Sequence, residues 1–339
     1  MFDFHWKKHR KKKEREKKMI KYMKIYMIAL SLLVILLGGI DASAAARLQV
    51  SFIDAGQGSA IFIQSGGKNT LIDAGDEKYY EKLKKFLVKK KLKKIDQLVI
   101  THNDPDHIGN ADKVISKYGV RTVIQAKYGY DREAKTKDVK DFRKAVNKYK
   151  VRIVKVTKGS TINFGSVKGT VLSTGKKYKK TNQTSLVIRV IQGKHRFLFT
   201  GGMYSSNEKD IMKKYDVKST VLQVPHHGSY TSGSTAFLKK AKPEYVVISC
   251  GKNNPYHHPR PEVMKQLKKY AKKIYQTDKN GTVTFSSDGK TDNEIRIAGG
   301  YHGKETTDAQ RLPMDVGNRT DCMLDYDLRM VEWENGLWI

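Results

Sequence analysis

From Leu48 onward, short apolar runs alternate with Gly-rich turns, and this pattern predicts a series of β-strands. Several of these runs are too short for helices and are rich in Val, Ile and Phe, which favours the extended conformation. The expected strands are Leu48–Ile53, Ala60–Ile63, Asn69–Asp73, Gln97–Thr101, Val120–Gln125, Arg152–Thr157, Ser166–Ser173, Ser185–Gln192, Arg196–Thr200, Thr220–Val224 and Tyr245–Ser249.

Between the strands lie stretches whose apolar residues recur at helical spacing. Glu77–Lys91 places Leu83, Phe86 and Leu87 on one stripe and lysines elsewhere, which predicts an amphipathic helix. The remaining helices are expected around Val114 and Tyr118, at Val139–Tyr149 and at Glu262–Lys272, and a hairpin is expected at Ile274–Ser286. Strands grouped in two halves with helices among them indicate an α/β protein.

The two ends of the chain differ from this central pattern. Eleven Lys and Arg residues precede Tyr26, Met27–Ile40 is almost wholly apolar over fourteen residues, and Ala42–Ala44 has a small-x-small pattern. We therefore predict a signal peptide in residues 1–44, because this apolar run is shorter than the roughly 20 residues that a spanning helix needs. An uncleaved signal anchor is the alternative. The protein is then extracytoplasmic, either secreted or anchored to the bacterial membrane.

Charge divides the remainder of the chain into two parts. Residues 45–290 hold 50 Lys and Arg against 20 Asp and Glu, whereas residues 291–339 hold five basic and ten acidic residues. We predict one domain over 45–290 and an acidic, flexible tail over 291–339. The basic excess favours a polyanionic partner such as nucleic acid, teichoic acid or a lipid surface, although a generally lysine-rich protein has the same composition.

The candidate chemistry lies in two loops that each follow an expected strand. The first, Thr101–Gly109, holds two histidines and two carboxylates within six residues, and the second holds His226 and His227. Borderline divalent ions take imidazole nitrogen and carboxylate oxygen together. A structural alternative is that Asp104 or Asp106 caps the following helix. The two clusters together predict a hydrolytic metal centre.

These loops resemble the His-x-His-x-Asp-His signature of the metallo-β-lactamase superfamily, with Asp104 in place of the middle histidine. More narrowly, the chain resembles the hydrolase domain of ComEC-like competence proteins, the DNA-uptake channels of bacteria. The resemblance spans Leu48–Lys290 and implies the αββα four-layer sandwich. The matching stretches are Phe52–Gly58, Leu71–Gly75, the loop after Ile100, His226–Ser229, and Gly251–Pro259.

Resemblance and ligand chemistry together assign the site residues. The expected ligands of Zn²⁺ or Mn²⁺, one or two ions per chain, are His102, Asp104, Asp106, His107 and His226, with His227 as the alternative to His226 or as a supporting residue. Asp54 and Asp73 are expected to accept hydrogen bonds from ligand imidazoles, unless they only form turns, and Asn182 is expected to support the site. The expected catalytic residues are Asp106 and His258, of which His258 would contact a phosphate or protonate the leaving group, with a plain loop histidine as the alternative.

Two departures from the family pattern leave the function open between two classes. Gly202 stands where the family has a metal-bridging Asp, and Ser59 stands where it has another Asp. The first hypothesis is an exported phosphodiesterase, nuclease-like, that attacks with metal-bound hydroxide. The second is a degenerate, DNA-binding protein on the same fold. We expect about one tightly held metal ion per chain and a second ion after Gly202→Asp. The expected partner is DNA or another polyanion. The N-terminal segment is expected to associate with a membrane surface. The sequence identifies no protein partner.

Overall fold

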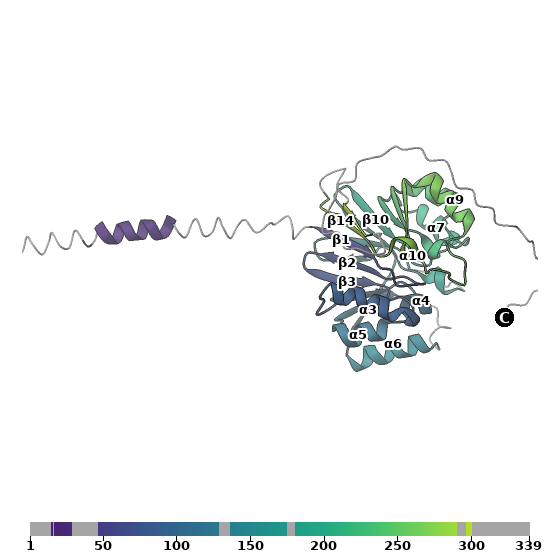
Figure 1. Ribbon diagram of the computed structural model, residues 1–339, viewed down its shortest axis with the longest axis horizontal. Coiled ribbons are helices and arrows are strands. Elements are labelled where there is room, and N and C mark those ends of the chain that lie inside the picture. The colour runs from purple at the N-terminus through teal and green to yellow at the C-terminus, as the bar shows by residue number, and fades with distance from the viewer. Residues whose placement is uncertain are drawn as a thin grey trace, which may run out of the picture. The chain divides into compact units, whose positions relative to one another are not determined.

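The computed structural model describes residues 15, 17–28, 47–128, 136–174, 180–289 and 296–299. Residues 17–28 form a helix (Figure 1). Most of the apolar run Met27–Ile40, the small-x-small pattern and nearly all of the predicted acidic tail lie outside the described residues. Within the described ranges, no helix combines the length and the apolar character that crossing a membrane requires.

The first sheet contains eight strands in the order β15-β14-β1-β2-β3-β4-β5-β6. From β15 to β3, neighbouring strands pair in antiparallel fashion, whereas β3, β4, β5 and β6 run parallel to one another. The strand bounds are β1 Leu48–Phe52, β2 Ile61–Ser65, β3 Lys68–Ile72, β4 Gln97–Ile100, β5 Thr122–Ala126, β6 Arg152–Val156, β14 Val283–Ser287 and β15 Arg296–Ala298.

The second sheet contains seven strands in the order β13-β12-β11-β10-β9-β8-β7. Here β10, β11, β12 and β13 are parallel, and β7, β8 and β9 pair in antiparallel fashion. The strand bounds are β7 Thr161–Asn163, β8 Lys168–Ser173, β9 Val187–Gln192, β10 His195–Phe199, β11 Val221–Gln223, β12 Tyr245–Ile248 and β13 Lys273–Gln276.

Helices cover the outer face of each sheet (Figure 1). Leu83, Val114 and Phe142 pack on the first sheet, while Ile211, Phe237 and Leu267 pack on the second. The helical bounds are η1 Glu77–Tyr79, α3 Tyr80–Lys89, α4 Pro105–Ile108, α5 Ala111–Tyr118, α6 Lys137–Lys148, η3 Thr181–Thr184, α7 Ser205–Met212, η4 Pro225–Gly228, α8 Thr235–Ala241, α9 Pro261–Tyr270 and α10 Thr277–Asn280.

A shared apolar core joins the two sheets face to face. Phe52 of β1 and Phe199 of β10 are both fully buried, with ring centroids 6.2 Å apart, and Val99 and Val247 belong to the same core. With helices outside and two mixed sheets inside, the chain has four layers, as predicted.

The parallel strands of both sheets place their carboxyl ends at the edge where the two ligand-rich loops lie. The first loop follows β4, and the second follows β11. Loops after parallel strands gather at one edge because every such strand ends on the same side. Residues 120 positions apart in the sequence, such as His107 and His227, therefore meet there.

The structure corrects several expectations about the elements. The hairpin expected at Ile274–Ser286 is wrong, because β13 pairs with β12 in the second sheet whereas β14 pairs with β1 in the first. Beyond the expected domain end at Lys290, β15 continues the first sheet by pairing with β14. The helices α7 and α8 and the short strand β7 were not anticipated.

Candidate metal centre

The first loop turns the end of β4 directly into the helix α4. Pro105 occupies the first turn of α4, where its missing N–H costs nothing, and Asp104 is the residue that caps it. The Asp104 side chain makes no capping hydrogen bond, however, so its carboxylate is available to the site. The purely structural explanation of this carboxylate therefore fails.

The second loop reverses direction within two residues. His226 and His227 have φ angles of 49° and 56°, in the left-handed region that is unfavourable for residues other than glycine. This turn aims the second histidine, and not the first, toward the α4 loop. His227 is held there because its Nδ1–H donates to the carbonyl oxygen of Ser249 at 2.7 Å.

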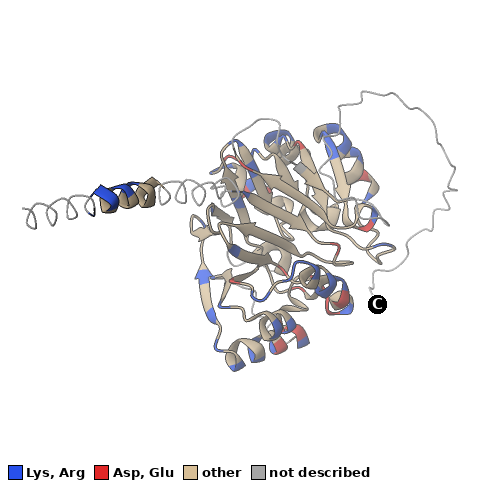
Figure 2. Ribbon diagram, turned by 60° about the vertical axis from the view of Figure 1, so that its left-hand side comes forward, with Lys and Arg blue, Asp and Glu red and all other residues tan. Residues whose placement is uncertain are grey.

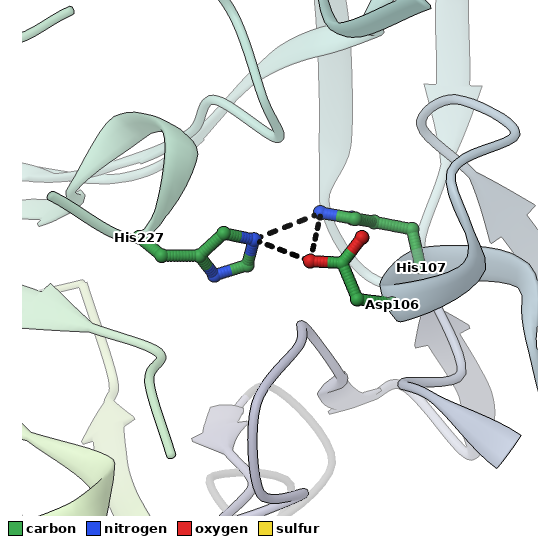
Figure 3. A group of neighbouring side chains, drawn as sticks. All are labelled: Asp106, His107 and His227. Atoms are coloured by element: carbon green, nitrogen blue, oxygen red, sulfur yellow. Dashed lines mark hydrogen bonds and ion pairs between the residues drawn. The ribbon is translucent and has the colours of Figure 1, made fainter. Parts of the chain in front are cut away.

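Asp106, His107 and His227 form one compact group of ligand atoms (Figure 3). The Nε2 atoms of the two histidines are 3.2 Å apart, and Asp106 Oδ2 lies 3.0 Å from His227 Nε2 and 3.9 Å from His107 Nε2. Both imidazoles are buried, and the Asp106 side chain is 24% exposed. The group is therefore enclosed but reachable from one side.

Hydrogen bonds around the group fix the tautomers that metal binding requires. The Nδ1–H of His107 donates to Asp73 Oδ2 at 2.7 Å, while that of His227 donates to a carbonyl oxygen. Each Nε2 then faces the other and a carboxylate oxygen, so that all three atoms can turn lone pairs toward one cation. Three such atoms suit a divalent ion, so the residues fit the metal that the site chemistry predicts.

The electrostatic environment is dominated by these contacts. Burial favours the neutral carboxyl, but the imidazoles of His107 and His227 hold the pKa of Asp106 well below its usual range. Burial likewise opposes the charged imidazole, yet Asp73 and Asp106 together raise the pKa of His107. The three groups therefore share one site of strong mutual interaction.

His226 and His258 lie beside the group and not within it. The Nδ1 atom of His226 lies 2.7 Å from Thr231 Oγ1, and the ring stacks on Tyr204. The preference for His226 as ligand is thus corrected in favour of His227. Burial, then His227 and Arg260, lowers the pKa of His258 to about 4, which does not favour the protonated form that leaving-group donation needs.

Of the two carboxylates expected to orient imidazoles, only Asp73 does so. Asp54 instead accepts from Lys82 Nζ at 2.8 Å and from the amide of Gly56 at 3.2 Å, so it stabilises a turn. Ser59 is buried and accepts a hydrogen bond from Gln223. The expectation for Asp54 was therefore wrong, and the turn-forming alternative describes it.

The remaining expected residues form a second half of the site. His102 Nε2 lies 3.4 Å from Asp104 Oδ2, and the ring centroids of His102 and His107 are 4.0 Å apart. Asn182 Nδ2 donates to the same oxygen of Asp104 at 2.6 Å. His102, Asp104 and Asn182 thus adjoin the ligand group without belonging to it.

Aromatic and basic side chains to which the sequence analysis assigned no role lie beside His226 and His258. Tyr230 is 72% exposed, more than any other large hydrophobic side chain among the described residues from 47 onward, and Arg260 lies over its ring at 5.9 Å. Tyr256 is 55% exposed and stacks on His258, and Lys180 lies over Tyr204. No periodic signal in the sequence reveals this rim, because its members lie in separate loops.

With this geometry established, comparison with known proteins defines the class. The metallo-beta-lactamase superfamily profile matches residues 53–252. The chain belongs to the metallo-β-lactamase superfamily, and it is a hydrolase-like member with a His/Asp group suited to a metal.

The chain is also distantly related to competence proteins. It is 31% identical to ComE operon protein 3 of Bacillus subtilis over 70% of this chain and 33% of that protein. It is 29% identical to Recombination protein 2 of Haemophilus influenzae, over 69% of this chain and 28% of that one. Competence protein ComA of Neisseria gonorrhoeae is 27% identical over 70% and 32% respectively. The chain thus spans about a third of the length of these relatives.

Among solved structures, the metallo-β-lactamase fold protein YhfI of Bacillus subtilis is similar with a TM-score of 0.49. It is 16% identical and covers 71% of this chain and 100% of that one.

Proposed function

We propose that this chain is an exported, metal-dependent phosphodiesterase with a nuclease-like substrate. The observation that carries the proposal is the group of Asp106, His107 and His227, whose ligand atoms lie within 4.8 Å of one another. A divalent ion bound there supplies an activated water at neutral pH and neutralises charge on the attacked group. The relatives named for competence and recombination support a nucleic acid as substrate.

The chain's own residues prepare the site for this role. Asp73 and the Ser249 carbonyl keep the protons of His107 and His227 on Nδ1, so that Nε2 faces the opening. Arg260 and Lys180 lie over the rings of Tyr230 and Tyr204, and their positive charges there can attract a phosphate. Tyr230 and Tyr256 offer exposed ring faces beside them, on which bases of a single strand can stack.

Export and the basic surface complete the proposal. The basic N-terminal stretch, the apolar run and the small-x-small pattern support secretion or anchoring to a membrane. Lys and Arg occupy the helices of both outer layers, which favours an anionic substrate (Figure 2).

The decisive assay offers single-stranded DNA, double-stranded DNA and a chromogenic phosphodiester with added Mn²⁺ or Zn²⁺. His227→Asn keeps an N–H for Ser249 and tolerates the left-handed backbone, but it removes Nε2, so we expect hydrolysis to fall at least about 100-fold. His257→Asn is the matched control, because His257 is exposed and also left-handed. Absence of turnover in folded, metal-loaded protein would defeat the proposal.

A second function is favoured by Gly202, which offers no side-chain oxygen between two ions. On this view, the chain binds DNA without cutting it, and the affinity falls steeply with salt because each neutralised phosphate releases counterions. Salt-sensitive binding without any hydrolysis would support this second function. Binding that ignored salt up to physiological strength would contradict it.

A further inference from the structure

Gly202 is not an empty position in this protein. A Cβ atom added there would lie 2.0 Å from Asn182 Oδ1, 2.9 Å from Asn182 Cγ and 3.1 Å from His102 Cε1. The first two distances are shorter than any tolerated contact, so a side chain at 202 and that of Asn182 cannot occupy their places together. The space next to Gly202 is therefore filled by Asn182.

Hydrogen bonds to Ser185 and Asp104 hold Asn182 in this position. Ser185 Oγ donates to the Asn182 carbonyl oxygen at 2.7 Å and accepts from the Gly202 amide at 3.0 Å. The Asn182 side chain is in turn tied to Asp104 Oδ2 by the 2.6 Å hydrogen bond from Nδ2. The two segments are thus fastened together, and the amide cannot leave without breaking its bond to Asp104.

The tautomer of His102 determines which of its ring nitrogens carries a lone pair. The Thr101 hydroxyl donates its hydrogen to Asp73, and the Ser185 hydroxyl donates its hydrogen to the Asn182 carbonyl oxygen. Each hydroxyl oxygen can therefore only accept a hydrogen bond from His102 Nδ1, which lies 3.0 Å from Thr101 Oγ1 and 3.3 Å from Ser185 Oγ. The proton of His102 is therefore on Nδ1. Its Nε2 is buried, has no hydrogen-bond partner among the described residues and lies 3.4 Å from Asp104 Oδ2.

We propose that Asn182 and Gly202 together limit this chain to one metal ion. The Asn182 Oδ1 fills the space of a side chain at 202, and its N–H occupies the Asp104 oxygen that would otherwise share a cation with His102. One lone pair and a hydrogen-bonded carboxylate make a poor second site, so the chain holds one ion, at Asp106, His107 and His227. The proposal rests on the same metal site as the proposed function but not on its substrate.

The simple expectation that Gly202→Asp alone builds a two-ion site is thereby revised. The new carboxylate must first expel the Asn182 side chain from a buried place. Removal of Oδ1, Cγ and Nδ2 by Asn182→Ala frees that place and releases Asp104. Only the double variant then offers three ligands, namely His102 Nε2, Asp104 and the carboxylate introduced at position 202.

The test is a cycle of the natural protein, Asn182→Ala, Gly202→Asp and the double variant. We measure bound Mn²⁺ by plasma emission after gel filtration, and Tm in chelator, so that neither readout depends on hydrolysis. We expect about one bound ion in the natural protein and in Asn182→Ala, and about two in the double variant. The Tm should fall by roughly 3–8 °C in Gly202→Asp, and much of this loss should be recovered in the double variant.

Asn182→Asp supplies a second test that changes no volume and serves if Gly202→Asp does not fold. It replaces the N–H by a carboxylate oxygen beside Asp104, and we expect about two ions per chain. Two firm ions in the natural protein that fall to one in Asn182→Ala would overturn the proposal, since Asn182 would then be a ligand. Additive Tm effects in the cycle, or one ion in Asn182→Asp, would overturn it as well. A protein that binds one ion but hydrolyses nothing would refute only the proposed function.

Discussion

At the scale of single residues, Asp73 determines whether His107 can act as a ligand. Its two oxygens accept from His107 Nδ1, from the Thr101 hydroxyl and from the Thr101 amide. Asp73 is fully buried and has a left-handed backbone with φ of 58°. Such a buried acceptor fixes both the orientation and the tautomer of the ring.

Asp73→Asn should weaken metal binding about 10- to 100-fold. The amide can present N–H₂ to His107 Nδ1, which moves the ring proton to Nε2 and removes its lone pair. Asn is also tolerated in the left-handed region, so the backbone is preserved. Competition with a chromophoric chelator measures the dissociation constant for Zn²⁺ or Mn²⁺.

Asp54→Asn is the control for this change. Asp54 binds Lys82 and an amide at the turn, and its bonds reach no imidazole. We expect its metal affinity to stay within about twofold of the natural protein, because Asp54 orients none of the proposed ligands. Equal weakening by both substitutions would show that Asp73 acts through general charge and not through the tautomer.

At the scale of elements, the loops after β11 and β12 shape the opening of the site. The loop 229–234 is held by Glu208 of α7, whose carboxylate accepts from the amides of Gly233 and Ser234. The loop after β12 is clamped by Asn254, which bonds the carbonyl oxygens of Gly251 and His258. These fixed loops present Tyr230 and Tyr256 to solvent.

Tyr230→Ala should therefore weaken binding of single-stranded DNA more than that of duplex. Stacking of one base on an aromatic ring contributes about 1–3 kcal/mol, which corresponds to roughly a 5- to 150-fold change in affinity. Bases in a duplex are already stacked and cannot use the ring. Fluorescence anisotropy with labelled oligonucleotides measures both affinities.

Tyr149→Ala is the matched control. Tyr149 is 46% exposed and lies beneath the ammonium of Lys148, much as Tyr230 lies beneath Arg260. It follows α6 and precedes β6, so it lies at the amino end of the parallel strands, opposite the site. Similar losses from both substitutions, or equal losses for duplex and single strand, would contradict a stacking role.

The elements show how far the sequence alone could lead. The alternation of apolar runs predicted the main strands because each buries at least one face, and ligand chemistry predicted the loop after β4. The sequence could not predict that β13 and β14 belong to different sheets, because two strands close together in the sequence usually form a hairpin. His227 was second choice because only the left-handed turn at both histidines reveals which ring points inward. Likewise, no pattern shows that Asn182 fills the space beside Gly202.

At the scale of the whole molecule, the site lies where the two sheets meet. Asp106 and His107 belong to the loop after β4 of the first sheet, and His227 follows β11 of the second. The Nε2 atoms of the two imidazoles lie 3.2 Å apart, close enough to hold one cation between them. A bound ion would therefore link the two halves of the domain.

Metal should therefore stabilise the entire domain. At a free concentration 100 times the dissociation constant, an ion that binds only the folded state adds about 2.7 kcal/mol, which for a domain of this size raises Tm by roughly 5–10 °C. His227→Asn should lose most of this rise, because it leaves ligands from the first sheet alone, whereas His257→Asn should keep it. Differential scanning calorimetry with and without Mn²⁺ measures the shift. An equal rise in His227→Asn would place the stabilising ion elsewhere and remove the link between the sheets.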